Sequence, residues 1–194
     1  MSTLKGILFI QVAGEAINSL IEELQKKYTV KKGRRFNHAN VTYEINRPHL
    51  SGNCLEFEIS SKIPQDEVKD DKEMKTYFQE IKKRMNAEKD KPVSIEMENI
   101  VWDSKKDSEK ERDYVKLLYS YPLEDLFDND QVQKEYEKIR NNPKPEDMPE
   151  ATGAMTVAGG VVLGQVRQTV AAIVQEHINQ LMEANKAIRT QLKK

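Results

Sequence analysis

The sequence predicts an α+β fold: a ferredoxin-like body with a helical extension and a C-terminal helical arm. Three observations predict it. Over the first 102 residues, apolar patterns of strand and helix period follow the order β-α-β-β-α-β, the split βαβ order of ferredoxin-like domains. All thirteen Phe, Trp and Tyr residues lie at or before Tyr136. Prolines at positions 143, 145 and 149 then interrupt the chain.

The first strand is expected over residues 4–12, LKGILFIQV, which is too continuously apolar for a strand with one exposed face. An amphipathic helix is the alternative, because only Gly6 and Gly14 interrupt this region. From Glu15 onward a helix is predicted, with Lys26 and Lys27 in its last turn. Its apolar face is formed by Ile17, Leu20, Ile21, Leu24 and Tyr28.

Two alternating segments follow, VTYEIN (residues 41–46) and CLEFEIS (residues 54–60). Apolar and polar residues alternate in both, so each is predicted as a strand with one apolar and one polar face. The segment between them contains Pro48 and Gly52 and is predicted as a turn or short loop. Together the two strands form a predicted hairpin.

The rest of the body is predicted as follows. A helix is expected over residues 66–87 and a strand over residues 93–102, followed by a solvated, highly charged run. A short helix with an apolar face from Tyr114 to Tyr121 is expected to end at Pro122, and another helix is expected over residues 130–140.

The domain organisation expected from these patterns has three parts: a compact body at 1–140, a proline-rich connector at 141–150 and an arm at 151–194. The arm has no aromatic residue, so it is poorly supplied to form a core of its own. Its first sixteen residues, 151–166, carry no charge and contain four of the eight glycines. They are read as a small-residue segment or hinge leading into a helix.

The helix of the arm is predicted from residue 165 to residue 192, without Pro or Gly. Apolar residues recur at alternating spacings of three and four, which indicates a coiled-coil seam with Asn185 at an a position. A broader apolar face that packs on the chain's own body is the alternative. The residues expected to make contacts with a partner are Val166, Val170, Ile173, Val174, Ile178, Leu181, Asn185, Ile188 and Leu192.

Motifs for chemistry are sparse, and no catalytic residue, metal site or cofactor is expected. The histidines, His38, His49 and His177, have no metal-ligand spacing, and Cys54 is the single cysteine. His38 and His49 could meet Cys54 across the hairpin, but unrelated surface or turn positions are the simpler reading. No phosphate-binding glycine loop is present in the sequence.

One basic cluster could bind nucleic acid. It has four cations within five residues and a neighbouring aromatic ring, a combination that can contact phosphates and stack on a base. Its members are Lys31, Lys32, Arg34, Arg35 and Phe36. A charged loop at the entry to the hairpin is the alternative interpretation.

Composition narrows the function classes. The formal net charge is −1, so no chain-wide field favours nucleic acid or anionic lipid. No apolar run approaches the roughly 20 residues of a spanning helix, and no leader pattern is evident, so a cytoplasmic setting is expected.

The sequence therefore favours a non-enzymatic structural or adaptor subunit that self-associates or binds a protein partner through its arm. A single-stranded nucleic-acid-binding protein using residues 31–36 is the first alternative. A membrane-active effector that inserts residues 151–166 after oligomerisation is the second.

Overall fold

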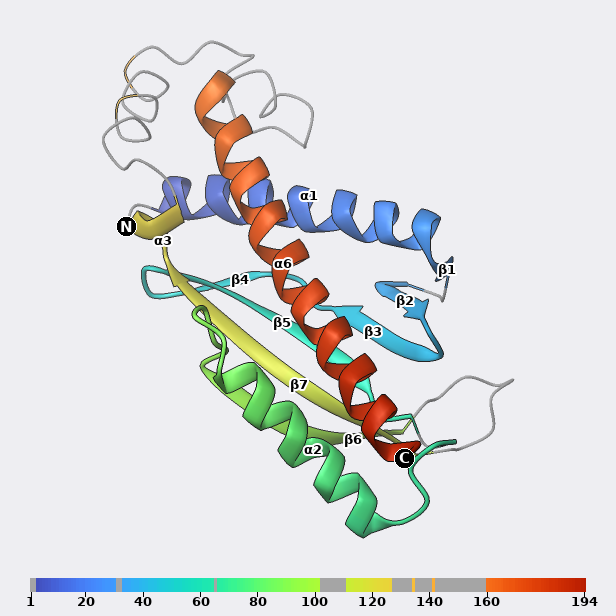
Figure 1. Ribbon diagram of the computed structural model, residues 1–194. Coiled ribbons are helices and arrows are strands. Elements are labelled where there is room, and N and C mark those ends of the chain that lie inside the picture. Colours follow the sequence, from blue (N-terminus) through green and yellow to red (C-terminus); the bar gives the residue numbers. More distant parts are fainter. Residues whose placement is uncertain are drawn as a thin grey trace. The chain divides into compact units, whose positions relative to one another are not determined.

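The computed structural model describes residues 3–30, 33–64, 66–101, 111–126, 134, 141 and 160–194. Helices and an antiparallel sheet are both present, so the α+β class is confirmed (Figure 1). The described helices are α1 Thr3–Lys27, α2 Asp71–Asn86, α3 Leu123–Leu126 and α6 Gly160–Leu192. The strands are β1 Thr29–Val30, β2 Arg35–His38, β3 Val41–Ile45, β4 His49–Ser51, β5 Cys54–Lys62, β6 Ser94–Val101 and β7 Glu111–Pro122.

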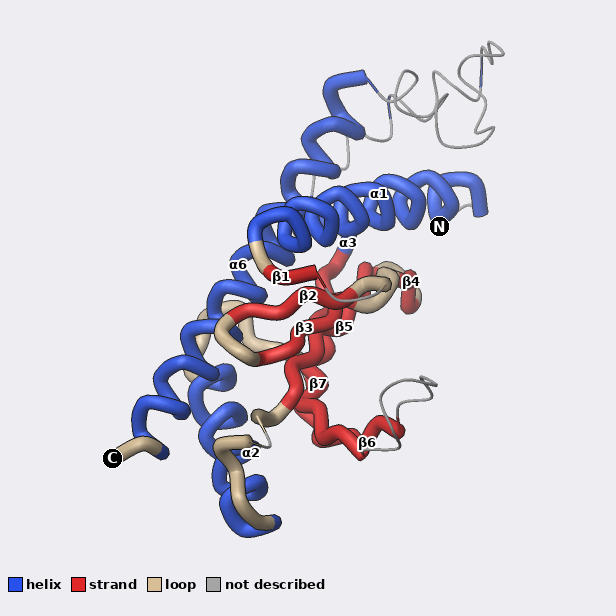
Figure 2. The backbone as a smooth tube through the Cα atoms, turned by 90° about the vertical axis from the view of Figure 1, so that its right-hand side faces the viewer, coloured by secondary structure: helices blue, strands red, loops and turns tan. Residues whose placement is uncertain are grey.

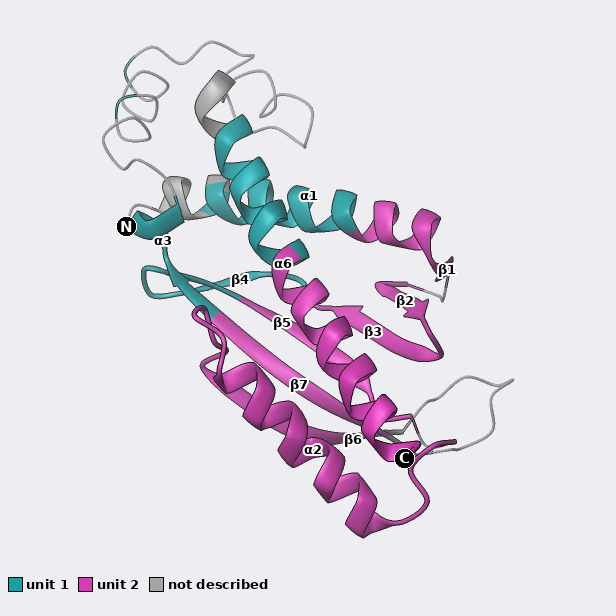
Figure 3. Ribbon diagram, viewed as in Figure 1, with its two compact units in different colours: residues 1–20, 47–56, 120–175 teal, residues 21–46, 57–119, 176–194 magenta. Residues whose placement is uncertain are grey.

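The chain forms two compact units that are discontinuous in sequence (Figure 3). Unit 1 comprises residues 1–20, 47–56 and 120–175, and unit 2 comprises residues 21–46, 57–119 and 176–194. The elements α1, β5, β7 and α6 each continue from one unit into the other. The expected division into body, connector and arm stays a prediction, because most of residues 127–159 lie outside the described residues.

The sheet has seven strands in the order β1-β2-β3-β5-β7-β6, with β4 paired to β5 off this path (Figure 2). The predicted hairpin is confirmed: β3 pairs antiparallel with β5, with Tyr43 opposite Ser61 and Ile45 opposite Ile59. The short strand β4 lies in the connection between them and pairs with the start of β5. Gly52, in the turn after β4, has a φ of +59°, which a residue with a Cβ rarely adopts.

Unit 2 places α2 and the C-terminal half of α6 on one face of its sheet. Tyr77 of α2, Tyr43 of β3 and Ser61 of β5 all bond to Asn185 of α6. The predicted helix over residues 66–87 is confirmed from Asp71, because the Asp70 carboxylate accepts a 2.8 Å bond from the Glu73 N–H and so caps the helix there. Its buried side chains are Tyr77, Ile81 and Met85.

The ferredoxin-like element order is not confirmed, and two local predictions are wrong. Residues 4–12 are helical and belong to α1, so the strand expected there is wrong and the alternative of a helix is confirmed. Phe9, Val12, Ala13 and Ala16 are buried at helical spacing, in phase with the later part of the same helix. The continuous apolar run concealed that period. Gly14 does not interrupt the helix, since one isolated glycine costs only about 1 kcal/mol there.

The second wrong prediction is the short helix at residues 114–121, which belong to strand β7. Val115, Leu117 and Tyr119 alternate on one side of the strand and are all buried. A short apolar run fits both the helix period and the strand period. Here the segment forms a strand because it pairs with β6 along eight residues. The predicted helix at 130–140 lies outside the described residues apart from position 134.

Candidate interaction surfaces

The C-terminal helix, read from the sequence as a surface for a partner, is largely covered by its own chain. Two of its nine predicted contact residues retain appreciable exposure: Leu192 is 38% exposed and Ile173 is half-buried. The other seven are buried, namely Val166, Val170, Val174, Ile178, Leu181, Asn185 and Ile188. In unit 1, Arg167 of this helix pairs with Glu15 of α1 at 2.5 Å. The structure therefore supports the alternative of packing within the chain and does not support a coiled coil.

Asn185 is bonded entirely within unit 2. The Tyr77 hydroxyl donates to its Oδ1 atom. Its Nδ2 group lies 3.3 Å from the Tyr43 hydroxyl oxygen, 3.3 Å from Ser61 Oγ and 3.1 Å from the Leu181 carbonyl oxygen. Burial raises the pKa of both tyrosines well above the usual value, so both hydroxyls stay protonated. The amide therefore fixes the register of α6 against the sheet and α2.

A second polar contact holds the same half of the helix. Arg189 forms a two-pronged pair with Glu67, with nitrogen–oxygen distances of 2.7 and 2.6 Å, and also donates to the Ala39 carbonyl. The hydrogen bonds from Arg189 lower the pKa of the Glu67 carboxyl. Arg189 is not part of the apolar repeat of the helix, so its partner could not be identified from the sequence pattern.

His177 belongs to the core of unit 2. Its ring stacks on Tyr119 with centroids 3.8 Å apart, and its Nδ1 atom lies 3.1 Å from Gln180 Oε1. Burial lowers the pKa of His177. His49 instead lies 2.9 Å from Glu56, and Cys54 is half-buried. Within the described residues no group of three or more His, Cys, Asp or Glu side chains could hold a metal ion.

The basic cluster is only partly described, since Lys31 and Lys32 lie outside the described residues. Arg34 Nε donates to the Ile45 carbonyl at 2.8 Å, and Arg35 pairs with Glu44 at 2.6 Å. Phe36 is fully buried. Its ring is stacked between Tyr28 and Tyr43, with centroids 5.9 and 5.3 Å away. The aromatic ring expected to stack on a base is thus part of the core.

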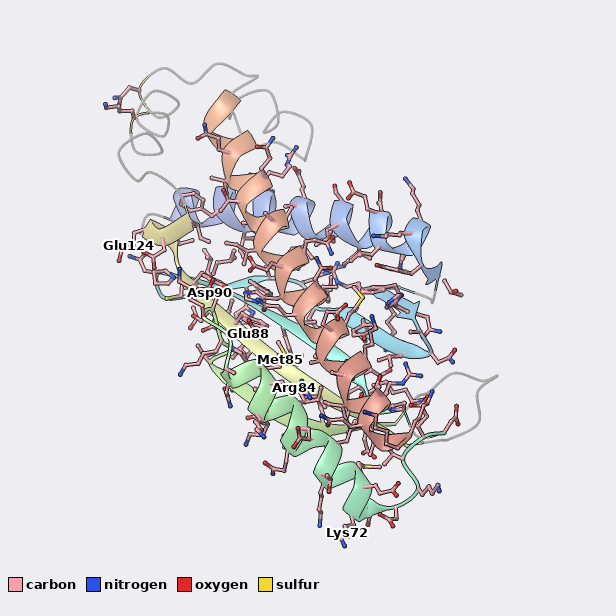
Figure 4. All side chains as sticks on the ribbon, in the orientation of Figure 1. Lys72, Arg84, Met85, Glu88, Asp90 and Glu124 are labelled. Atoms are coloured by element: carbon pink, nitrogen blue, oxygen red, sulfur yellow. The ribbon has the colours of Figure 1, made fainter. Side chains whose placement is uncertain are left out.

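A groove in unit 2 lies between the C-terminal end of α2 and α6, with a volume of about 670 Å³. Arg84, Met85 and Glu88 line its α2 side and follow one another toward Asp90, with Lys72 at the far end of the helix (Figure 4). Glu176 and Glu183 line its α6 side. The groove is open to solvent, and its charged lining consists of one arginine and three glutamates.

The feature that the sequence analysis missed is the edge surface, which we define as residues 93–98 on and beside strand β6. Strand β6 ends the sheet order, opposite the two-residue strand β1. Val93 is 61% exposed and Met97 is 40% exposed. A strand was predicted over residues 93–102, and β6 covers Ser94–Val101, but its place at the end of the sheet was not predicted. Pro92 and paired glutamates, both typical of edge strands, were the available sign.

Glutamates occupy the other side of the edge surface. Glu96 and Glu98 are exposed and lie two positions apart, on the same side of β6. Lys116 of β7, directly opposite Glu96 in the register, bonds Glu98 and lies 3.5 Å from Glu58. One ammonium group is therefore shared by two carboxylates and lies opposite a third, which leaves the edge surface acidic.

No described helix meets the length and hydropathy needed to cross a bilayer. Residues 151–159, most of the segment considered for membrane insertion, lie outside the described residues. Comparisons with protein-family models, with curated proteins and with solved structures found no match.

Proposed function

We propose that this protein is a protein-binding subunit that takes up an extended segment of another protein as an added strand beside β6. One observation carries the proposal: an eight-residue strand at the end of the sheet contains the exposed Met97, follows the exposed Val93, and has no described partner along its outer edge. A strand at the end of a sheet presents backbone N–H and C=O groups to which a further strand can bond.

The two ends of the sheet differ in a way that favours β6. Strand β1 at one end has only two residues, and very short edge strands resist pairing with other chains. Strand β6 pairs with β7 along its full length, from Ser94 opposite Leu118 to Val101 opposite Glu111, and so holds a long, regular edge. Among the described residues, nothing pairs with its outer side.

The positions of the exposed apolar side chains also favour a binding site at β6. Four large hydrophobic residues in the described part of the chain are exposed: Ile7, Val93, Met97 and Leu192. Met97 lies on β6, and Val93 directly precedes the first residue of the strand, four positions before Met97. Ile95, between them, is half-buried. An added strand could cover this row with its own alternate side chains.

This proposal keeps the protein-binding role expected from the sequence and moves it from the C-terminal helix to the sheet edge. The reason is burial, since seven of the nine contact residues predicted on the helix are already covered. Unlike those residues, Val93 and Met97 need no rearrangement of the described structure before a partner can reach them.

The test uses a neutral eight-residue peptide of alternating Thr and Val, added to the full chain while amide exchange and chemical shifts of residues 93–98 are followed by NMR. Two N-methylated versions carry methyl groups on alternate residues, in one phase or the other. Strand addition predicts that one phase abolishes binding and the other does not, because only every second N–H of the peptide faces β6. Equal behaviour of both phases would contradict the proposal.

A matched pair of variants tests the location. Val93→Ser combined with Met97→Ser should weaken peptide binding about tenfold, because apolar contact area is lost. Leu192→Ser removes an exposed large hydrophobic residue elsewhere and should leave binding unchanged. Equal affinity of the wild type and the Val93→Ser, Met97→Ser variant would place the binding site away from β6.

A further inference from the structure

We infer that the segment taken up by β6 is basic, with Lys or Arg alternating with aliphatic residues; this inference rests on the proposed function above. The edge surface has two chemically different sides. Ile95 and Met97 lie on one side, and the exposed Val93 directly precedes the strand. Ser94, Glu96 and Glu98 lie on the other. Because side chains of neighbouring strands lie beside one another on the same face, an added strand meets aliphatic groups with one set and carboxylates with the other.

The charge on the polar side is not neutralised within the described structure. Lys116 bonds Glu98 and lies 3.5 Å from Glu58, so its ammonium group is already shared between two carboxylates. Glu96 lies directly opposite Lys116 but forms no ion pair with any described residue. Glu96 and Glu98 are the two carboxylates that cationic side chains on an added strand would lie beside, and the single ammonium group near them is shared with Glu58 of β5.

The same charges disfavour a second copy of this chain as the occupant. Two copies of β6 that pair about a two-fold axis along most of their length are centred on Met97 or Glu98. The first centre places Glu96 opposite Glu98 of the other copy, and the second places Glu98 opposite Glu98. Like charges directly opposite each other destabilise a strand pair, so both registers are disfavoured. A basic segment meets the same positions with opposite charge.

Glutamates on an edge strand have a simpler use, which is to prevent unwanted pairing. The two explanations differ in what happens when the charges are removed. If the glutamates only protect the edge, neutral variants should self-associate and the charge of an added peptide should not matter. If they select a basic segment, a basic peptide should bind more tightly than a neutral one and should lose that advantage in the neutral variant.

The experiment compares three eight-residue peptides, alternating Lys–Val, Thr–Val and Glu–Val, by fluorescence anisotropy with the full chain. At 50 mM salt we expect Lys–Val to bind at least tenfold more tightly than Thr–Val, and Glu–Val to show no binding. The advantage of Lys–Val should largely disappear at 0.5 M salt, where charges more than a few ångströms apart are screened. A peptide of four Lys followed by four Val, with the same charge, should bind no better than Thr–Val.

The variant Glu96→Gln with Glu98→Gln should abolish the advantage of Lys–Val and leave the affinity for Thr–Val unchanged. Glu22→Gln with Glu23→Gln, two exposed glutamates of α1, is the matched control with the same change in net charge.

If Thr–Val binds and Lys–Val binds no more tightly, the inference of a basic segment is wrong and strand addition stands. If no peptide protects β6 and the Gln variant self-associates, the glutamates only protect the edge and both proposals fail. Equal binding of the block peptide would show attraction without strand pairing and would also overturn the inference.

Discussion

Asn185 gives the sharpest test of how the C-terminal helix is held. This side chain is 1% exposed and contacts the hydroxyls of Tyr77, Tyr43 and Ser61. Replacing it with Ala removes those contacts and leaves two tyrosine hydroxyls, each in a residue 1% exposed, without this partner. The change therefore combines the loss of buried hydrogen bonds with a small cavity.

The magnitude follows from these contacts. Leaving a buried polar group without a partner costs about 1–3 kcal/mol, and at least two such groups remain. Ala is a better helix former than Asn by about 0.6 kcal/mol, which offsets part of the loss. We expect Asn185→Ala to lower the free energy of unfolding by about 3 kcal/mol. The assay is urea unfolding of the full chain, followed by circular dichroism.

Asn179→Ala is the matched control, because it makes the same substitution at an exposed position of the same helix. It should shift the unfolding midpoint much less than Asn185→Ala does. Tyr77→Phe removes the donor to Asn185, so the double variant of Tyr77→Phe and Asn185→Ala should cost less than the sum of the single variants. Equal midpoints for Asn185→Ala and Asn179→Ala would refute the reasoning.

Three further predictions concern stability. Arg189→Ala should lower the free energy of unfolding by about 1–2 kcal/mol at pH 7 by removing the paired contact to Glu67. The pKa of Glu67 is lowered in the folded state. The stabilisation from this ion pair is therefore fully present above the unfolded pKa, about 4.3, and is lost as pH falls through the folded pKa. Urea unfolding midpoints of the wild type and the variant at pH 7 and pH 3 test this pH dependence. Burial lowers the pKa of His177, so the unfolded chain takes up a proton at a higher pH than the folded chain. The free energy of unfolding should therefore fall as pH drops below about 6.5. Unfolding curves from pH 8 to pH 5 should show a smaller pH dependence for His177→Phe than for the wild type. Gly52→Ala should destabilise the protein by about 1 kcal/mol, because the φ of Gly52 is +59°. Gly14→Ala should stabilise it by about 0.5–1 kcal/mol, because Gly14 lies in α1 with open space at the Cβ position. Thermal melts of the two variants should show melting-temperature shifts of opposite sign.

The sequence by itself determined the elements with a long, clear period. The helix beginning near Glu15, the α2 helix, the alternation in β3 and β5 and the long C-terminal helix follow from spacing alone, because one face of each must be buried. The short apolar runs did not have this property. Residues 4–12 and 114–121 were assigned the wrong type, since a run apolar on all sides fits both periods and only its neighbours select one.

The tertiary structure decided what each buried face contacts. Periodicity identified the apolar stripe of α6 and the position of Asn185 on it, but could not distinguish a partner chain from the chain's own sheet and α2. Tyr77 and Asn185 are separated by 108 positions, and no local pattern relates them. The edge surface also depends on contacts between segments that are distant in the sequence. The alternation of β6 was readable, but exposure of Val93 and Met97 follows from the place of the strand in the sheet, and strand order depends on pairings between distant segments.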